Sequence, residues 1–164
     1  MKANQSLRCE LRGSTYFSGR RPDHLHFLLF SDRDGIKVYQ SWNSWGYYAR
    51  SFSAMDAASK AYEIKHREGE WAKNAPTTHA INKGDFLIED IYLCDGTWRI
   101  TPQLPVGQPA KLRIIGRFQN QTDKDAMNTG VWTGQIESKS LEIALEKECV
   151  DRLNAERGQG PVWF

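Results

Sequence analysis

Polar and apolar residues alternate along much of the first 52 residues, and this alternation predicts a series of short β-strands. In LRCELR (7–12), leucine and cysteine occupy one parity and charged residues the other, which is typical of a half-buried strand. The apolar run 24–30 is followed by an Asp-Gly pair at 34–35, which favours a hairpin turn. Further strands are expected over 36–42 and 47–52.

The pattern then changes to helical spacing. Ser53 is a suitable N-cap, Asp56 stands where a capping box has its acid, and alanines recur with Ile64 on one stripe until Gly69. A helix is therefore expected between Ser53 and Gly69, followed by a polar connection over 70–85.

The rest of the chain repeats this order. Strands are expected over 86–93, 97–101, 111–118 and 131–136, with a polar loop over 119–130 and a helix over 139–156.

This order of elements predicts an α+β fold of antiparallel sheets, each followed by a covering helix. The expected organisation is a sheet-plus-helix half over 1–72, a connector over 73–85, and a second such half over 86–164 packed against the first. One fused sheet is the alternative, because sheet-then-helix order is common in α+β folds and does not require a duplication.

Composition and charge narrow the choice of function. The net charge is +2, from 22 basic and 20 acidic side chains, which excludes a strongly basic nucleic-acid coat and an acidic DNA mimic but leaves room for local patches. The three cysteines lie far apart without a CxxC pair, so neither a disulfide framework nor a zinc site is expected, and a reducing compartment is favoured. No signal peptide or membrane span is expected, and the location is predicted to be cytoplasmic.

Basic side chains follow the strand pattern. Lys111, Arg113 and Arg117 share one parity of their strand, opposite a run of apolar residues. Arg8 and Arg12 share one parity of the first strand. A sheet face that carries basic and aromatic side chains can follow a phosphate backbone and stack bases, grip an acidic protein surface, or simply face solvent.

The predicted binding surface combines these cations with aromatic residues at the edge of the sheet. Its residues are Arg8, Arg12, Lys37, Tyr39, Trp42, Trp45, Tyr47, Arg50, Lys111, Arg113 and Arg117. Lys37 and Tyr39 join it if their strand lies beside the first one. A Gly/Ser-rich loop with Arg20 and Arg21 is a further candidate for anion binding.

Residues 26–71 contain, in order, the strand HFLLF, the acidic turn SDRDG, the strand KVYQSW, the triplet SWG at 44–46, the segment SAMDAASKAY and the ending EIKHREGEW. This order resembles a WGR domain, the sheet-plus-helix module of poly(ADP-ribose) polymerases and some bacterial proteins. The resemblance implies a non-catalytic module that contacts nucleic acid, often near a DNA end, or a neighbouring protein domain. It places Trp45 near the ligand. Tyr47 stands where the family has its arginine, and Arg50 is the nearest substitute.

Histidines provide a second kind of candidate site. His24 and His26 are two apart in a predicted strand and therefore share a face, where Asp23 or a carboxylate on a neighbouring strand could complete a divalent-metal site. Such a site would suit a metal-dependent phosphodiesterase. The alternative is that His24 and His26 bind no metal and are simply polar residues on the less buried face of the sheet. His66, on the outer face of the predicted helix, and His79, in the connector, are interpreted as solvated.

The preferred function is therefore non-enzymatic binding of nucleic acid, or of a nucleic-acid-processing protein complex, through a basic and aromatic sheet face without a cofactor. One alternative is a protein inhibitor or accessory factor of phage or plasmid origin that acts on a host system. The other is the phosphodiesterase centred on the two histidines.

Overall fold

The computed structural model describes residues 6–13, 23–72 and 74–156, together with the backbone of 162–163. Strands make up 52% and helices 13% of the structure, so the fold is mainly antiparallel sheet and is compatible with an α+β class. None of the helices in the described residues has the length and apolar character needed to cross a bilayer.

The elements follow one another along the chain as short segments. In order they are β1 (Leu7–Gly13), β2 (His24–Ser31), β3 (Ile36–Tyr39), α1 (Ser44–Tyr47), β4 (Arg50–Met55), β5 (Ala61–His66), β6 (Glu70–Trp71), β7 (Thr78–Ile81), β8 (Phe86–Tyr92), β9 (Trp98–Thr101), β10 (Ala110–Asn120), α2 (Lys124–Thr129), β11 (Gly134–Leu145), α3 (Lys147–Asn154) and β12 (Val162–Trp163).

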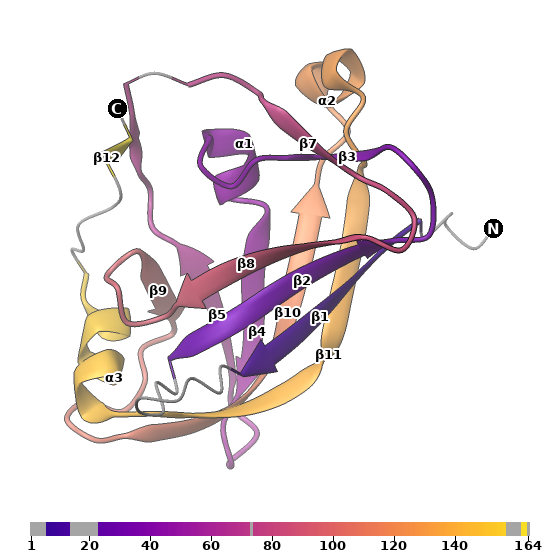
Figure 1. The fold of residues 1–164 in the computed structure, drawn as a ribbon. Helices are drawn as coiled ribbons and strands as arrows, with labels where there is room; N and C mark the ends of the chain where they lie inside the picture. Colours follow the sequence, from indigo (N-terminus) through magenta and orange to yellow (C-terminus); the bar gives the residue numbers. More distant parts are fainter. Residues whose placement is uncertain (1–5, 14–22, 73, 157–161, 164) are drawn as a thin grey trace.

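Two antiparallel sheets form the body of the molecule. One has the strand order β1-β2-β8 and the other has the order β11-β10-β4-β5-β9. In Figure 1 the three-stranded sheet lies in front of the five-stranded sheet, with α3 beside β9. Two small ladders complete the fold: β3 pairs antiparallel with β7, and β6 pairs parallel with β12.

The core lies between the facing sides of the two sheets. Phe27 of β2 meets Phe52 of β4 edge-on, with 6.3 Å between ring centroids, and both side chains are 1% exposed. Gly116 of β10 marks a close approach of the sheets, because a Cβ there would lie 2.8 Å from the Phe27 ring. Each large apolar side chain buried here contributes roughly 1.5–3 kcal/mol relative to an exposed one.

Both sheets combine strands from the two expected halves. β8, from the range 86–164, pairs with β2, and β10 pairs with β4, so the ranges 1–72 and 86–164 share both sheets and one hydrophobic core. The predicted connector 73–85 contains β7, whose Ile81 is buried. The turn at 31–35 joins strands of different ladders rather than a hairpin, because β3 pairs with β7.

The predicted helix from Ser53 to Gly69 is wrong, because this range forms the hairpin of β4 and β5. Phe52, Ala54, Tyr62 and Ile64 all point into the core. The buried side chains in this range therefore recur every second residue, as in a strand. Asp56, the expected capping acid, instead accepts hydrogen bonds from backbone N–H groups inside the turn. The helix implied by the WGR resemblance is therefore a β-hairpin.

This change of structure also relocates His66. Its ring is not on a solvated helix face but stacks between Tyr47, at a centroid distance of 3.9 Å, and Trp98, at 3.5 Å. Burial lowers the pKa of His66 to about 3. His79, on β7, is exposed as expected.

The second predicted helix, over 139–156, is only partly correct. β11 continues to Leu145, because it pairs with β10 along most of its length, and only α3 is helical. α3 lies against β9, the edge strand of the five-stranded sheet, and buries Val150 and Leu153. A short helix, α2, lies in the expected loop 119–130 and is capped by Asp123.

A disulfide joins Cys94, just after β8, to Cys149 of α3 across 55 residues, and only Cys9 is a free, buried thiol. The expectation of no disulfide is therefore wrong. Spacing along the chain did not reveal that the fold brings these two residues within 4.9 Å between Cα atoms. The inference of a reducing compartment thereby loses its basis.

Candidate functional site

The outer side of the five-stranded sheet, called here the open face, carries the basic residues of β10. Lys111, Arg113 and Arg117 point outward, whereas the alternate residues of β10 are buried, as the parity predicted. The pairing register places Lys65 of β5 next to Arg99 of β9, and Ser51 of β4 between Lys65 and Arg117. Cations from three strands therefore lie on one surface. Two of these cations, Lys65 and Arg99, are not part of the binding surface predicted from the sequence.

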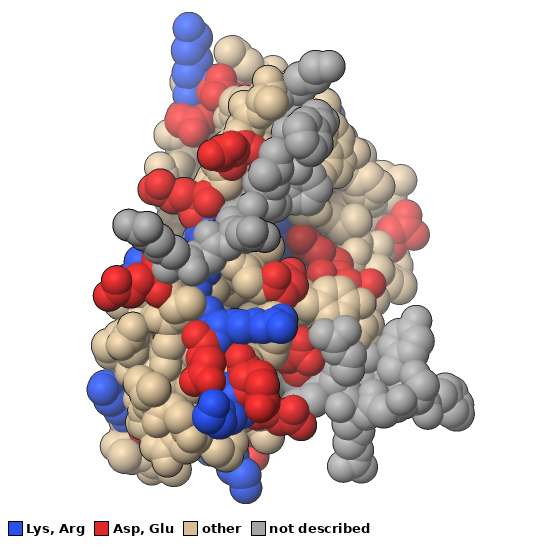
Figure 2. All heavy atoms as spheres, turned by 90° about the vertical axis from the view of Figure 1, so that its left-hand side faces the viewer, with Lys and Arg blue, Asp and Glu red and all other residues tan. Residues whose placement is uncertain are grey.

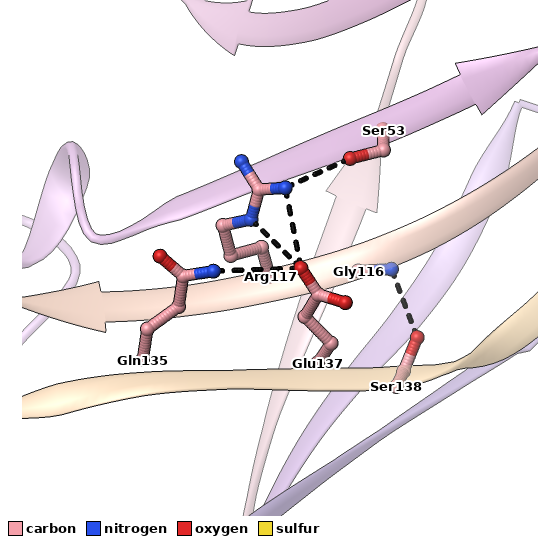
Figure 3. Close-up of polar contacts among 6 residues, drawn as sticks. All are labelled: Ser53, Gly116, Arg117, Gln135, Glu137 and Ser138. Carbon is pink, nitrogen blue, oxygen red and sulfur yellow. Dashed lines mark hydrogen bonds and ion pairs between the residues drawn. The ribbon is translucent and has the colours of Figure 1, made fainter.

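Carboxylates on the same face partly neutralise these cations. Arg117 contacts Glu137 at 3.2 Å and Ser53 at 3.1 Å, as Figure 3 shows. Arg113 approaches Glu142 at 3.5 Å. Lys65 binds Glu63 at 2.9 Å. Exposed pairs of this kind contribute at most about 1 kcal/mol each, so a stronger anionic ligand can displace them.

Two cations of the open face differ from the others in their ion pairing. Among the described residues, neither Arg99 nor Lys111 has a carboxylate partner at ion-pair distance. Lys111 and Arg113 also line a hollow of about 540 Å³ beside the turn that joins β4 and β5. At the paired positions, the open face holds five cations against three carboxylates.

The arginines of β1 belong to a different surface. Arg8 and Arg12 lie on the outer side of the three-stranded sheet, and both bind Glu10 at 2.6 Å. Hydrogen bonds from Arg12 and Arg8 lower the pKa of Glu10. Lys37 and Tyr39 do not lie beside them as proposed, because β1 pairs with β2 and β3 belongs to another ladder.

The aromatic residues do not form an edge of the basic face. Tyr39 and Tyr47 are both 4% exposed and pack inside the protein. The indole N–H of Trp45 donates to Asp125 of α2 at 2.9 Å. Trp42 alone among these four is exposed. Strand pairing thus places the predicted aromatic and basic sets on different parts of the molecule.

Arg50 is not available to a phosphate ligand. Its side chain is 2% exposed, forms an ion pair with Glu89 of β8 and donates to the backbone oxygen of Gly46 at 3.1 Å. Its guanidinium also lies 5.2 Å from the ring centroid of Phe118. Arg50 borders a hollow of about 200 Å³ together with Trp42, but its role in the structure is to hold a buried charge pair.

The two histidines converge with a carboxylate on the outer side of the three-stranded sheet. Asp90 of β8 stands opposite His26 in the register, and one of its oxygens lies 3.1 Å from Nε2 of His24 and 2.8 Å from Nδ1 of His26. Hydrogen bonds from His24 and His26 lower the pKa of Asp90. A carboxylate on a neighbouring strand was expected, but which one was not readable from the sequence.

The predicted anion-binding arginines, Arg20 and Arg21, lie outside the described residues.

Both outer sheet faces carry acidic as well as basic side chains. Figure 2 shows acidic and basic side chains interspersed over the side of the molecule that bears α3 and β9. Net charge alone therefore does not identify a ligand, and the local arrangement on the open face is the relevant feature.

Comparisons with protein-family models, curated proteins and solved structures find no match to this chain. No family assignment follows from them, and the resemblance of residues 26–71 to a WGR domain stays a prediction. Function has to be inferred from the arrangement of the residues themselves.

Proposed function

We propose that the protein binds nucleic acid without catalysis and that the open face is its contact surface. The observation that carries the proposal is the strand register, which brings Lys65, Arg99 and Arg117 into one row across four strands. Arg113 and Lys111 lie on the same face of β10, further along the strand from Arg117. Successive strands lie about 4.8 Å apart, so such a row offers a linear polyanion three cations, with the neutral Ser51 between Lys65 and Arg117.

The expected mode of binding is electrostatic. The paired positions of the open face hold no aromatic side chain, so bases have no stacking platform there and sequence preference should be weak. The contact would neutralise phosphates and release counterions. If between two and five cations engage a duplex, the slope of log K against log salt lies between about −2 and −4.5.

The test is fluorescence anisotropy with labelled duplex DNA and single-stranded RNA between about 50 and 200 mM salt. The double variant Arg99→Ala with Arg113→Ala should weaken binding and reduce the magnitude of the slope by about 2. The matched control is Arg8→Ala with Arg12→Ala, which removes the same charge from the other sheet and should leave the slope unchanged.

Two results would contradict the proposal. One is an absence of binding to either nucleic acid at the lowest salt, which would favour a protein partner instead. The other is an equal loss in both double variants, which would mean that net charge rather than the open face governs binding.

A further inference from the structure

The outer side of the three-stranded sheet holds three metal-ligating side chains at one point. His24, His26 and Asp90 each offer one ligand atom, and these atoms all lie within 4.8 Å of one another. This site is separate from the open face, which lies on the other sheet. It uses none of the cations that the proposed binding of nucleic acid requires.

Strand geometry explains why the three residues meet. His24 and His26 are two apart in β2 and so project on the same side, and the antiparallel register sets Asp90 of β8 directly opposite His26. Tyr92, opposite His24, stacks on the His24 ring at a centroid distance of 4.3 Å with an interplanar angle of 13°. The backbone therefore brings the three residues together, and the stacked Tyr92 ring orients His24 before any ligand arrives.

The distances from the two histidines to Asp90 suit a shared cation. Nitrogen and oxygen ligands lie about 2.0–2.2 Å from a transition metal such as zinc, so ligand atoms bound to one tetrahedral ion lie roughly 3.3 Å apart. The two histidine-to-Asp90 distances, 3.1 and 2.8 Å, are close to that value. Small side-chain rotations would open the space for an ion between the three donors.

The burial pattern provides both a fixed and an accessible side. The His24 side chain is 5% exposed, the His26 side chain 23% and the Asp90 side chain 56%. An ion can therefore enter from the side of Asp90, and the coordination positions on that side face solvent. Two imidazoles with one carboxylate form a borderline ligand set that suits zinc, nickel, copper or iron rather than magnesium or calcium.

We propose that His24, His26 and Asp90 form a binding site for one divalent transition-metal ion with coordination positions open to solvent. The ion bridges β2 and β8 and replaces the hydrogen bonds that Asp90 otherwise accepts from both imidazoles. Water, or an anionic group of a ligand, completes its coordination.

The test titrates untagged, chelator-treated full-length protein with Zn²⁺ in a calorimeter and with Co²⁺ or Cu²⁺ under spectroscopic observation. One ion per chain should bind, and the Cu²⁺ electron paramagnetic resonance spectrum should show nitrogen couplings from imidazole. Loss of a residue that only supports a metal ligand typically weakens metal binding by about 10- to 100-fold. Because His26 and Asp90 are ligands themselves, His26→Ala and Asp90→Asn should each weaken binding by at least this much. Both residues are partly exposed, so circular dichroism should confirm that these variants remain folded.

The control is His79→Ala, which removes an exposed histidine from β7 and should leave the affinity unchanged. Failure of the wild-type protein to bind these ions at millimolar concentration would overturn the proposal. So would binding that His26→Ala and Asp90→Asn leave intact, since the ion would then be held elsewhere. Neither result depends on nucleic-acid binding by the open face.

Discussion

Among the ion pairs of the described residues, that of Arg50 and Glu89 should lose the most stability when one partner is replaced. Arg50 is 2% exposed, and Arg50→Met would leave the Glu89 carboxylate buried without its counter-charge. Removing one partner of a buried pair costs about 3–5 kcal/mol. That is a large part of the roughly 5–15 kcal/mol by which a domain of this kind is stable.

A double-variant cycle separates this effect from a simple loss of packing. Glu89→Leu alone should cost a similar amount, because it leaves the buried guanidinium unpaired. Arg50→Met combined with Glu89→Leu should cost much less than the sum, since replacing a buried pair with apolar groups is often nearly neutral. Urea unfolding followed by tryptophan fluorescence and circular dichroism gives each free energy.

The same variant has a signature in its pH dependence. Burial raises the pKa of Glu89, and Arg50 opposes this rise. Without Arg50 the folded protein holds a proton on Glu89 more tightly than the unfolded chain does. The stability that comes from this proton is present at low pH and is lost as pH rises above the ordinary value of 4.5. Relative to the wild type, Arg50→Met should therefore be less destabilised at pH 5 than at pH 8.

The matched control is Arg113→Met, which makes the same substitution at a side chain that is 63% exposed. Its cost should stay below about 1 kcal/mol. Unfolding of the two arginine variants at the same urea concentration would contradict a special role for the buried pair, and so would a double variant that costs the full sum of the singles.

Three further predictions concern stability, each measured by urea unfolding. Replacing Cys94 and Cys149 by alanine should cost about 4 kcal/mol from the entropy of a 55-residue loop, and an unchanged midpoint would show that the crosslink adds nothing. Gly46→Ala should cost at least about 2 kcal/mol, because a methyl group would overlap a backbone oxygen, whereas Gly13→Ala, with open space around it, should stay within about 0.5 kcal/mol. Because burial lowers the pKa of His66 to about 3, stability should fall by about 1.4 kcal/mol per unit as pH drops below 6.5, and His66→Phe should flatten that slope.

Alternation of polar and apolar residues was enough to predict several strands. β1, β8 and β10 lie close to their expected ranges, and the outward parity of Lys111, Arg113 and Arg117 is confirmed. The hairpin of β4 and β5 was not predicted because the alanines of this range fall at helical spacing, whereas the side chains that enter the core, Phe52, Ala54, Tyr62 and Ile64, alternate as in strands. Only the core provided by the facing sheet selects the alternating pattern.

Strand pairing is what the sequence did not reveal, and the candidate sites depend on it. Asp90 joins the two histidines only because β8 pairs with β2, and Arg99 joins the open face only because β9 pairs with β5. Because strand pairing was unknown, the aromatic residues were predicted to lie beside the basic residues, whereas the structure has the two sets on different parts of the molecule. Contacts between segments far apart along the chain are set by how the whole core packs, which local patterns do not encode.

The hydrogen bonding of β4 to β10, although residues 56 to 109 separate them, shapes how a newly made chain reaches its native form. When β4 and β5 leave the ribosome, both edges of their ladder are unpaired, because their neighbours β10 and β9 are made later. Ordering must await the late arrival of β10 and β11, so assembly depends on slow closure of a large loop. During that interval the exposed apolar hairpin is a natural substrate for chaperones, and messages truncated before β10 should yield aggregating rather than native fragments.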